Sequence, residues 1–423
     1  MSNYIKEKLY IGVKFLTNRE NIYIMAICLS FLIWIITIAF EGKDSSQLSV
    51  FFNRMDNFLA DFTNTVGYSA LRNPYNNLAY RGWEHKQYPP LAYVFYYICS
   101  KFSFNIDTYY EENFFLNMYK EPFFMFVLIL FYCITSVIIF EIVANNKKGS
   151  LFKKYGTALA VLLSYPVLFT IERGNNYIMA SIFVMIFVFY YDSTNKLLKE
   201  FALISLGVAF GLKLTPAVFG MLLLIDKKWF EAIRTGIYGL LSFFPPMLIF
   251  EGGAKNFFYF IRNLKISAES HSAFSGVSIL GSISYVVQNI FARDIPGTRI
   301  ESILILLNYI YLLLLLIFCI FYKDKWLRVL ALSIVAISAS GQAGEYSLLI
   351  FFPFIILFLN EKSDRINGVN TLVMMAILMM MCTYVSRFWI WDIHIGVLIM
   401  CLICGIIGVK DTYIYLKSKR EKQ

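Results

Sequence analysis

The chain has 423 residues, of which 58% are hydrophobic, 18% aromatic and only 16% charged, and its formal net charge is +10. An average soluble domain has about 25% charged residues, so the composition is that of a membrane protein. The positive charge does not indicate nucleic-acid binding, because the Lys and Arg residues cluster in short loops between apolar runs, as they do on the cytoplasmic side of membrane proteins. The seven cysteines lie mostly inside the apolar runs, which argues against a disulfide framework or a zinc site.

Apolar segments recur along the whole chain, and no polar block between them is long enough to form a soluble domain. A helix needs about 20 apolar residues to cross the hydrocarbon, and fewer where its neighbours let it stop short. The candidate spans are 21–40, 122–144, 157–171, 176–191, 200–212, 214–225, 235–250, 299–322, 327–340, 346–360, 368–385 and 393–409. The sequence therefore predicts an all-α, polytopic membrane protein of about 12 transmembrane helices, with residues 1–423 forming a single transmembrane domain.

The first long interval between spans is residues 41–121, and it contains a second apolar stretch, 88–104, that begins with two prolines. If this stretch crossed the membrane, the basic loop 145–154 would lie opposite the basic N-terminus, against the positive-inside bias. We therefore expect 41–121 to be one outer-face loop, in which a helix started by the prolines lies at the interface. Residues 251–298 are expected to form a second outer-face loop, and both termini are then cytoplasmic.

The segment 200–225 is flanked by basic or mixed loops on both sides, although only about 25 apolar residues separate those loops. Two half-length helices that meet at Lys213-Leu214-Thr215-Pro216 would place both flanks inside and Lys213 at the outer tip. A single long span with one loop misassigned is the alternative.

Two aspartates follow the first span, Asp56 and Asp61 in "RMDNFLADFTN". They are five residues apart, about 140° around a helix, so only one of them can easily face a given pocket. An ionisable group near membrane depth is a functional candidate, but either residue could instead solvate the loop or cap a helix.

Two cations stand at other outer junctions, Arg173 in "IERGNN" and Lys213 in "GLKLTP". A guanidinium and an ammonium group together suit a phosphate or a sugar phosphate, whereas the alternative is that Arg173 pairs locally with Glu172. Another outer turn, "SASGQAGEYS", carries Glu345 and Tyr346, and we expect Glu345 to be an ion-pair partner.

The three histidines, His85, His271 and His394, all fall on outer segments. Their spacing makes no metal motif, and we expect His394 to lie in an interfacial aromatic belt.

The outer-loop aspartate is followed in order by "NPY" (73–75), "YPPL" (88–91), "ERGN" (172–175) and "KLTP" (213–216). This order resembles the C-type (GT-C) integral-membrane glycosyltransferases, and among them the polyprenol-phosphate-mannose-dependent mannosyltransferase branch. The resemblance covers roughly residues 20–360. It implies transfer of a sugar, with inversion, from a polyprenyl-phosphate donor to a hydroxyl of a lipid-linked or cell-surface glycan acceptor, at the outer face of a bacterial plasma membrane.

The resemblance also assigns roles to residues. The catalytic aspartate falls on Asp61 or Asp56: the spacing to Pro74 favours Asp56, the local "DF-x-N" context favours Asp61, and we favour Asp61. Arg173 and Lys213 would bind the donor phosphate. The expected substrate-binding residues are Tyr75, Tyr88, His85, Glu345 and Tyr346.

Two further expectations concern cofactors and acid-base groups. The outer loop has no Asp-x-Asp, so we expect neither a metal nor another cofactor. Related enzymes often have a histidine in the later outer loop, where this chain has "GQAGEYS", so that role is unfilled or passes to Glu345 or Tyr346.

Two other classes of membrane protein compete with this interpretation. A transporter or flippase of lipid-linked saccharides would have two repeated halves with broken helices in corresponding positions, and one such break is visible. A polysaccharide polymerase resembles this chain in being polytopic but usually relies on Arg-rich outer loops, and here the outer arginines are few and scattered.

Overall fold

The computed structural model describes residues 18–42, 58–77, 82–112, 115–297, 299–339, 342–361, 368–383 and 392–421. Within these ranges the protein is mostly helical with almost no strand, which confirms the all-α prediction. The described residues form 18 α-helices and two short strands. The strands, β1 (Ser275–Gly276) and β2 (Gln342–Ala343), pair in parallel.

Among the described residues, four helices are long and apolar enough to cross a membrane: α2 (Arg19–Glu41), α7 (Pro122–Asn146), α16 (Ile300–Phe321) and α20 (Ile393–Arg420). A fifth span is possible if α8 (Leu151–Leu162) and α9 (Tyr165–Arg173), which meet at a bend of 40°, cross together. The other predicted spans coincide with described helices that are shorter or less apolar. These are α10 (Tyr177–Tyr190), α11 (Lys196–Leu212), α12 (Met221–Ile225), α13 (Trp229–Met247), α17 (Lys325–Ser338), α18 (Phe352–Asn360) and α19 (Val369–Met381). The count of about twelve full-length spans is therefore not confirmed.

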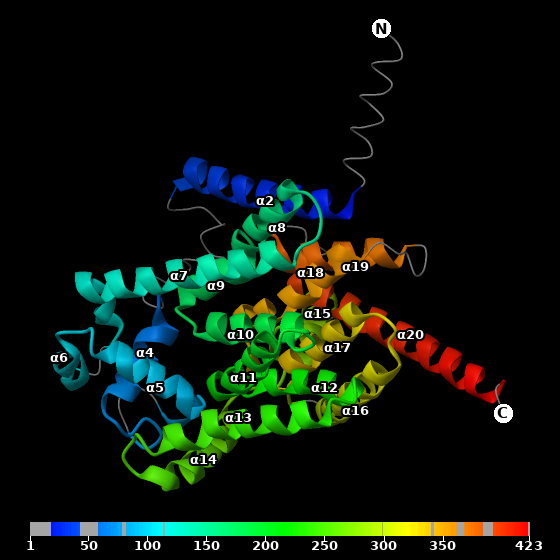
Figure 1. Ribbon diagram of the computed structural model, residues 1–423. Coiled ribbons are helices and arrows are strands. Elements are labelled where there is room, and N and C mark those ends of the chain that lie inside the picture. Colours follow the sequence, from blue (N-terminus) through cyan, green and yellow to red (C-terminus); the bar gives the residue numbers. More distant parts are fainter. Residues whose placement is uncertain are drawn as a thin grey trace.

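The long helices run roughly side by side across the view of Figure 1, with α4, α5 and α6 gathered at the left. Helix α2 begins toward the right and α20 ends toward the right, so the first and last described helices have these ends on the same side of the molecule.

The two segments predicted to be outer loops are largely helical. The first contains α4 (Ala60–Ala70), η3 (Trp83–His85), α5 (Pro90–Ser100), α6 (Ile106–Glu111) and η4 (Phe115–Lys120). The second contains η6 (Gly253–Lys255), α14 (Asn256–Ser270) and α15 (Ile279–Phe291). Helix α5 has Pro90 as its first residue, as the sequence predicts, because a proline at the first helical position loses no hydrogen bond.

The break predicted at Lys213 is present. Helix α11 ends at Leu212, Lys213 adopts an extended conformation (φ −151°, ψ 137°), and the 3₁₀ helix η5 (Thr215–Gly220) then leads into α12. Pro216 lies in the first turn of η5, where its missing N–H costs no helical hydrogen bond. Residues 200–225 thus form two helical pieces, and Lys213 lies between them.

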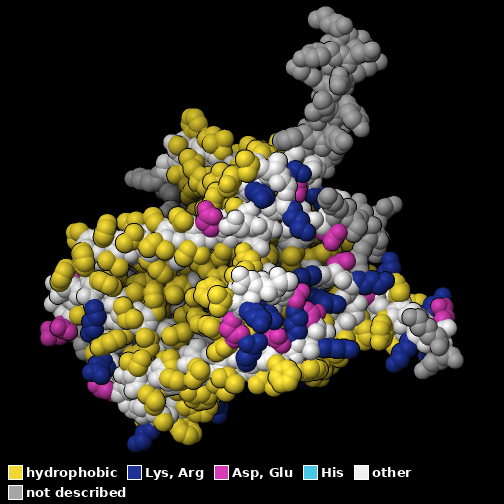
Figure 2. All heavy atoms as spheres, in the orientation of Figure 1, with side chains coloured by type: hydrophobic (Ala, Val, Ile, Leu, Met, Phe, Trp, Pro, Cys, Tyr) yellow, Lys and Arg dark blue, Asp and Glu magenta, His cyan; other side chains and the backbone are white. Residues whose placement is uncertain are grey.

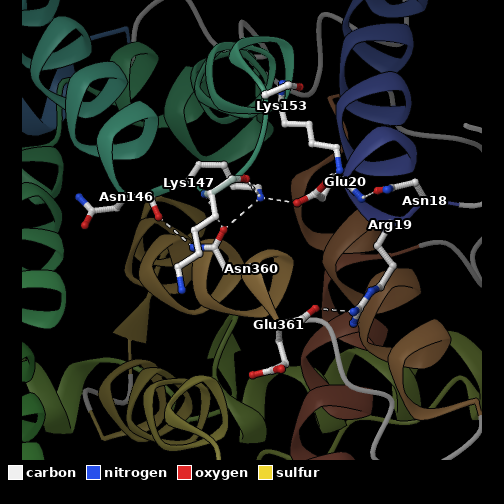
Figure 3. Close-up of polar contacts among 10 residues, drawn as sticks. Asn18, Arg19, Glu20, Asn146, Lys147, Lys153, Asn360 and Glu361 are labelled. Atoms are coloured by element: carbon white, nitrogen blue, oxygen red, sulfur yellow. Dashed lines mark hydrogen bonds and ion pairs between the residues drawn. The ribbon is translucent and has the colours of Figure 1, made fainter.

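A cluster of polar side chains ties the start of α2 to the turn between α7 and α8 and to the end of α18 (Figure 3). Glu20 forms ion pairs with Lys147 and Lys153. Asn360 accepts hydrogen bonds from Lys147 Nζ (3.0 Å) and from the Lys148 amide (2.9 Å), and it donates to the Asn146 carbonyl (2.8 Å). Segments far apart in the sequence are therefore joined at this end of the helices.

The surface is rich in apolar side chains. Figure 2 shows hydrophobic side chains over much of the visible face, whereas Lys, Arg, Asp and Glu gather mainly toward the right. Leu29 on α2, Phe126 on α7 and Leu240 on α13 are each more than half exposed. Large apolar side chains exposed side by side are unusual on soluble proteins and fit contact with lipid.

Candidate active site

Asp61 lies in the first turn of α4, and the start of this helix is attached to the end of α9. Leu59, which precedes α4, has a left-handed backbone (φ 55°), and its N–H donates to the Glu172 carbonyl at 2.9 Å. The "ERGN" segment therefore lies directly beside the aspartate.

Two side chains of that segment hold the Asp61 carboxylate. Arg173 Nη2 lies 2.7 Å from Asp61 Oδ1, and Asn175 Nδ2 donates to Asp61 Oδ2 at 2.8 Å. Within the described residues, Arg173 thus forms its ion pair with Asp61 and not with its neighbour Glu172, which was the local alternative. A charge-assisted hydrogen bond of this length fixes the orientation of the carboxylate.

Gly174, between these two residues, makes the close approach possible. It ends α9 in the left-handed conformation (φ 68°), which glycine adopts without steric cost. A Cβ at this position would lie 2.7 Å from the Cβ of Phe62, the residue next to Asp61. A larger residue would therefore push α9 away from α4.

Asn175 connects the carboxylate to the neighbouring elements. Its Oδ1 accepts a hydrogen bond from the Tyr177 N–H at 2.9 Å, which turns its amide nitrogen toward Asp61. The same nitrogen lies 3.5 Å from the Tyr88 hydroxyl. The sequence-based predictions did not name Asn175 or Tyr177 as site residues, although Asn175 belongs to the quoted "ERGN" motif.

Lys213 approaches the same site from the break after α11. Its Nζ lies 3.9 Å from the centre of the Tyr88 ring and 5.8 Å from the centres of the Tyr177 and Tyr346 rings. Desolvation lowers the pKa of Lys213 to about 7, and the negative charge of Asp61 opposes this shift. Lys213 thus has aromatic neighbours and forms no ion pair with the residues that the structure describes.

The arrangement can accept one proton and stabilise one anion. Each carboxylate oxygen has two acceptor positions, and Arg173 and Asn175 occupy one on each, so Asp61 retains capacity to accept a further hydrogen bond. The side chain of Asp61 is 20% exposed, so a substrate can reach it. Arg173 and Lys213 supply positive charge beside it.

The structure brings some of the predicted residues into this site and places others elsewhere. Tyr88 and Tyr346 surround Lys213, and Glu345 begins η7 (Glu345–Phe351) next to Tyr346. Tyr75 is fully buried, and its hydroxyl donates a hydrogen bond to the Tyr88 carbonyl at 2.9 Å. It therefore helps to hold the backbone of Tyr88 in place. His85 Nε2 lies 3.4 Å from Glu84 Oε1, and the centre of the His85 ring is 5.8 Å from that of the His271 ring.

His394 lies at the start of α20, where its ring stacks on Tyr285 with the ring centres 4.3 Å apart. Asp56 lies outside the described residues.

The family model for Glycosyltransferase family 87 matches residues 87–353. The chain belongs to this family. The matched region of the family 87 enzyme includes Arg173, Asn175 and Lys213, whereas Asp61 precedes it. Membership confirms the expected membrane glycosyltransferase. Neither the curated proteins nor the solved structures contain a match to the chain.

Proposed function

We propose that the protein transfers a sugar from a polyprenyl-phosphate donor to a hydroxyl of a lipid-linked or cell-surface glycan, with Asp61 as the catalytic base. The main support is the geometry around Asp61, whose carboxylate is held by Arg173 and Asn175. The half-buried Lys213 lies over the ring of Tyr88, and the Tyr88 hydroxyl is 3.5 Å from Asn175 Nδ2. The first donor to test is polyprenyl-phosphate mannose, because the order of the sequence motifs resembles that of the mannosyltransferase branch.

Asp61 would activate the acceptor. A sugar hydroxyl is a weak nucleophile until a positioned base accepts its proton, and such help contributes about 10² to 10⁴ in rate. In the proposed step the proton passes from the acceptor hydroxyl to Asp61, and the acceptor oxygen bonds to the anomeric carbon. The bond from that carbon to the phosphate oxygen breaks, and attack from the opposite side inverts the anomeric configuration.

Lys213 and Arg173 would stabilise the leaving group. As the glycosidic bond breaks, the bonding electrons leave with the polyprenyl phosphate, and negative charge grows on its oxygens. A protonated lysine and a guanidinium group in a partly desolvated site stabilise such charge. The proposal requires no metal or other cofactor.

The proposal places the reaction at the outer face of a bacterial plasma membrane, with both termini cytoplasmic. The positive-inside pattern of the loops supports this orientation, and so does the position of the start of α2 and the end of α20 on one side of the molecule. A lipid-linked donor suits a site built next to long apolar helices, since the polyprenyl chain can remain in the bilayer.

The deciding experiment is Asp61→Asn in purified protein. Turnover would be measured with a panel of polyprenyl-phosphate hexoses and pentoses as donors and octyl glycosides as acceptors. Asn keeps the shape of Asp but cannot take the proton, so we expect kcat to fall by about 10² to 10⁴ while the KM for the donor changes little. The melting temperature would be measured in parallel to separate loss of chemistry from loss of fold.

Asp107→Asn is the matched control. Asp107 is an exposed residue in the first turn of α6, so the same substitution should leave turnover unchanged. If Asp61→Asn turns over as fast as the wild type, Asp61 is not the base and the proposed mechanism is wrong.

A further inference from the structure

Three buried polar atoms, on α4 and on two helices packed against it, have no hydrogen-bond partner among the residues that the structure describes. They are the hydroxyl oxygens of Tyr96, on α5, and Tyr132, on α7, and the amide oxygen Oδ1 of Asn64, on α4. The three side chains are 0%, 6% and 8% exposed, respectively. Most buried polar atoms in folded proteins are paired, so three unpaired atoms near one carboxylate require an explanation.

These residues lie close to the proposed catalytic group. Asn64 follows Asp61 by three residues on α4, and side chains with this spacing share one side of a helix. The Tyr96 ring packs against that of Phe62, the residue after Asp61, with the ring centres 5.2 Å apart. Tyr132 belongs to the same aromatic cluster, because it packs against Phe131, whose ring centre lies 5.3 Å from that of Phe95. The Phe95 ring in turn packs against that of Phe62, with the ring centres 6.1 Å apart.

The Tyr96 ring also packs against Tyr88, in the part of the site that contains Lys213. Its centre lies 6.0 Å from that of the Tyr88 ring, which carries Lys213 on its face. Tyr96 is therefore next to the ring that holds Lys213. The three unpaired atoms come from α4, α5 and α7, whereas Arg173 is the last residue of α9 and Lys213 follows α11.

The chemistry of the unpaired atoms defines what they can bind. A tyrosine hydroxyl donates and accepts, an amide oxygen accepts, and none of the three carries a charge. Their complement is a neutral group that both donates and accepts, which is the chemistry of a sugar hydroxyl. We propose that Tyr96, Tyr132 and Asn64 bind hydroxyl groups of a neutral sugar beside Asp61. This inference rests on the proposed function and names the ligand chemistry of that same site.

The proposal predicts that removing one of these hydroxyls lowers activity without lowering stability. Phenylalanine keeps the tyrosine ring and removes only the unpaired oxygen, so it should not destabilise the ligand-free protein. If the hydroxyl binds a sugar, however, the same substitution removes a hydrogen bond from the complex. We expect Tyr96→Phe and Tyr132→Phe each to lower kcat/KM about tenfold, with a melting temperature no lower than that of the wild type.

Tyr23→Phe is the matched control. Tyr23, on α2, is also fully buried with an unpaired hydroxyl, but its electrostatic neighbours are Cys28 and Cys382. Turnover would be measured first with radiolabelled polyprenyl-phosphate mannose as donor and octyl mannoside as acceptor, and then with the other donors and acceptors of the panel. Tyr23→Phe should stay within about twofold of the wild type.

Two further measurements identify the hydroxyl. A rise in the KM for the donor assigns the contact to the transferred sugar, whereas a rise in the KM for the octyl glycoside assigns it to the acceptor. Octyl glycosides or donors that lack single hydroxyls complete a double-mutant cycle. Removing the hydroxyl that Tyr96 binds should slow the wild type about tenfold but should slow Tyr96→Phe little further.

The outcomes for this inference and for the proposed function are distinct. Suppose that kcat/KM of Tyr96→Phe and of Tyr132→Phe stays within about twofold of the wild type while Asp61→Asn is inactive. The proposed role of Asp61 as the base then stands, whereas the proposed binding of sugar hydroxyls is wrong. An equal loss in Tyr23→Phe would also overturn it, because the effect would not be local to the site. If Asp61→Asn is fully active, the proposed function fails and this inference falls with it.

Discussion

Gly174→Ala tests whether the contact between α4 and the end of α9 is needed to hold the site together. A Cβ at position 174 would lie 2.7 Å from Phe62 Cβ and 3.3 Å from Leu59 Cα, whereas ordinary contacts begin at 3.4 Å. Both neighbours are fixed to the backbone, so no change of rotamer relieves the clash. Relief requires the two segments to separate by at least about 0.7 Å, from the difference between these distances.

The expected cost has two parts. A left-handed backbone disfavours a residue with a Cβ by about 1–2 kcal/mol, and overpacking adds about 1–3 kcal/mol. The free energy of unfolding should therefore fall by about 2–5 kcal/mol. Because Gly174 lies between Arg173 and Asn175, the same movement displaces both partners of Asp61. A misplacement of about 1 Å in a catalytic constellation can lower the rate about 10²-fold, so a large loss of turnover is expected as well.

Gly368→Ala separates the two parts. Gly368 also has a left-handed backbone (φ 88°, ψ −21°), but a Cβ there would meet nothing within 4 Å. Unfolding in detergent and turnover would be measured for both variants. We expect Gly368→Ala to lose only the conformational part and to keep its turnover. Equal stability and equal turnover in the two alanine variants would refute the argument that α9 must touch α4.

Two further predictions concern charge. Burial lowers the pKa of Lys213 from its usual value of 10.5 to about 7, so folding stability should rise with pH between these values. Use of the donor should fall above about pH 7, because the ammonium charge is lost. Lys213→Arg should retain donor use at pH 9 if the charge alone matters, and pH profiles of kcat/KM for the donor would show this. Glu20→Gln leaves the fully buried Lys147 without its ion-pair partner, so it should lower the free energy of unfolding by about 3–5 kcal/mol. Glu269→Gln, in an exposed pair, should change the free energy of unfolding by less than about 0.5 kcal/mol. Equal effects of the two substitutions would contradict the role of burial.

The family comparison and the structure support different parts of the sequence-based interpretation. The family confirms glycosyltransferase activity, and the helices confirm an all-α protein with several membrane-spanning candidates. The number of spans was harder to predict because hydropathy measures composition over a window. It does not show the 40° bend between α8 and α9, which divides one apolar run at Leu163 and Ser164.

Within the site, residue types could be predicted but partners could not. The family resemblance favoured Asp61 over Asp56, and the sequence indicated Arg173 and Lys213, because charged residues at the ends of apolar runs stand out. It offered Glu172 as the partner of Arg173, since that residue is adjacent. The structure pairs Arg173 with Asp61 instead, across 112 positions of the chain.

The sequence by itself determined the helical class, the proline-started helix α5 and the break at Lys213, because these follow from apolar run length and from the backbone chemistry of proline. Only the tertiary structure decided that Asn175 holds Asp61, that Tyr88 faces Lys213, and that the hydroxyls of Tyr96 and Tyr132 have no partner in the described part of the chain. These features depend on how helices distant in sequence pack together, and local residue patterns carry no record of which side chains will meet.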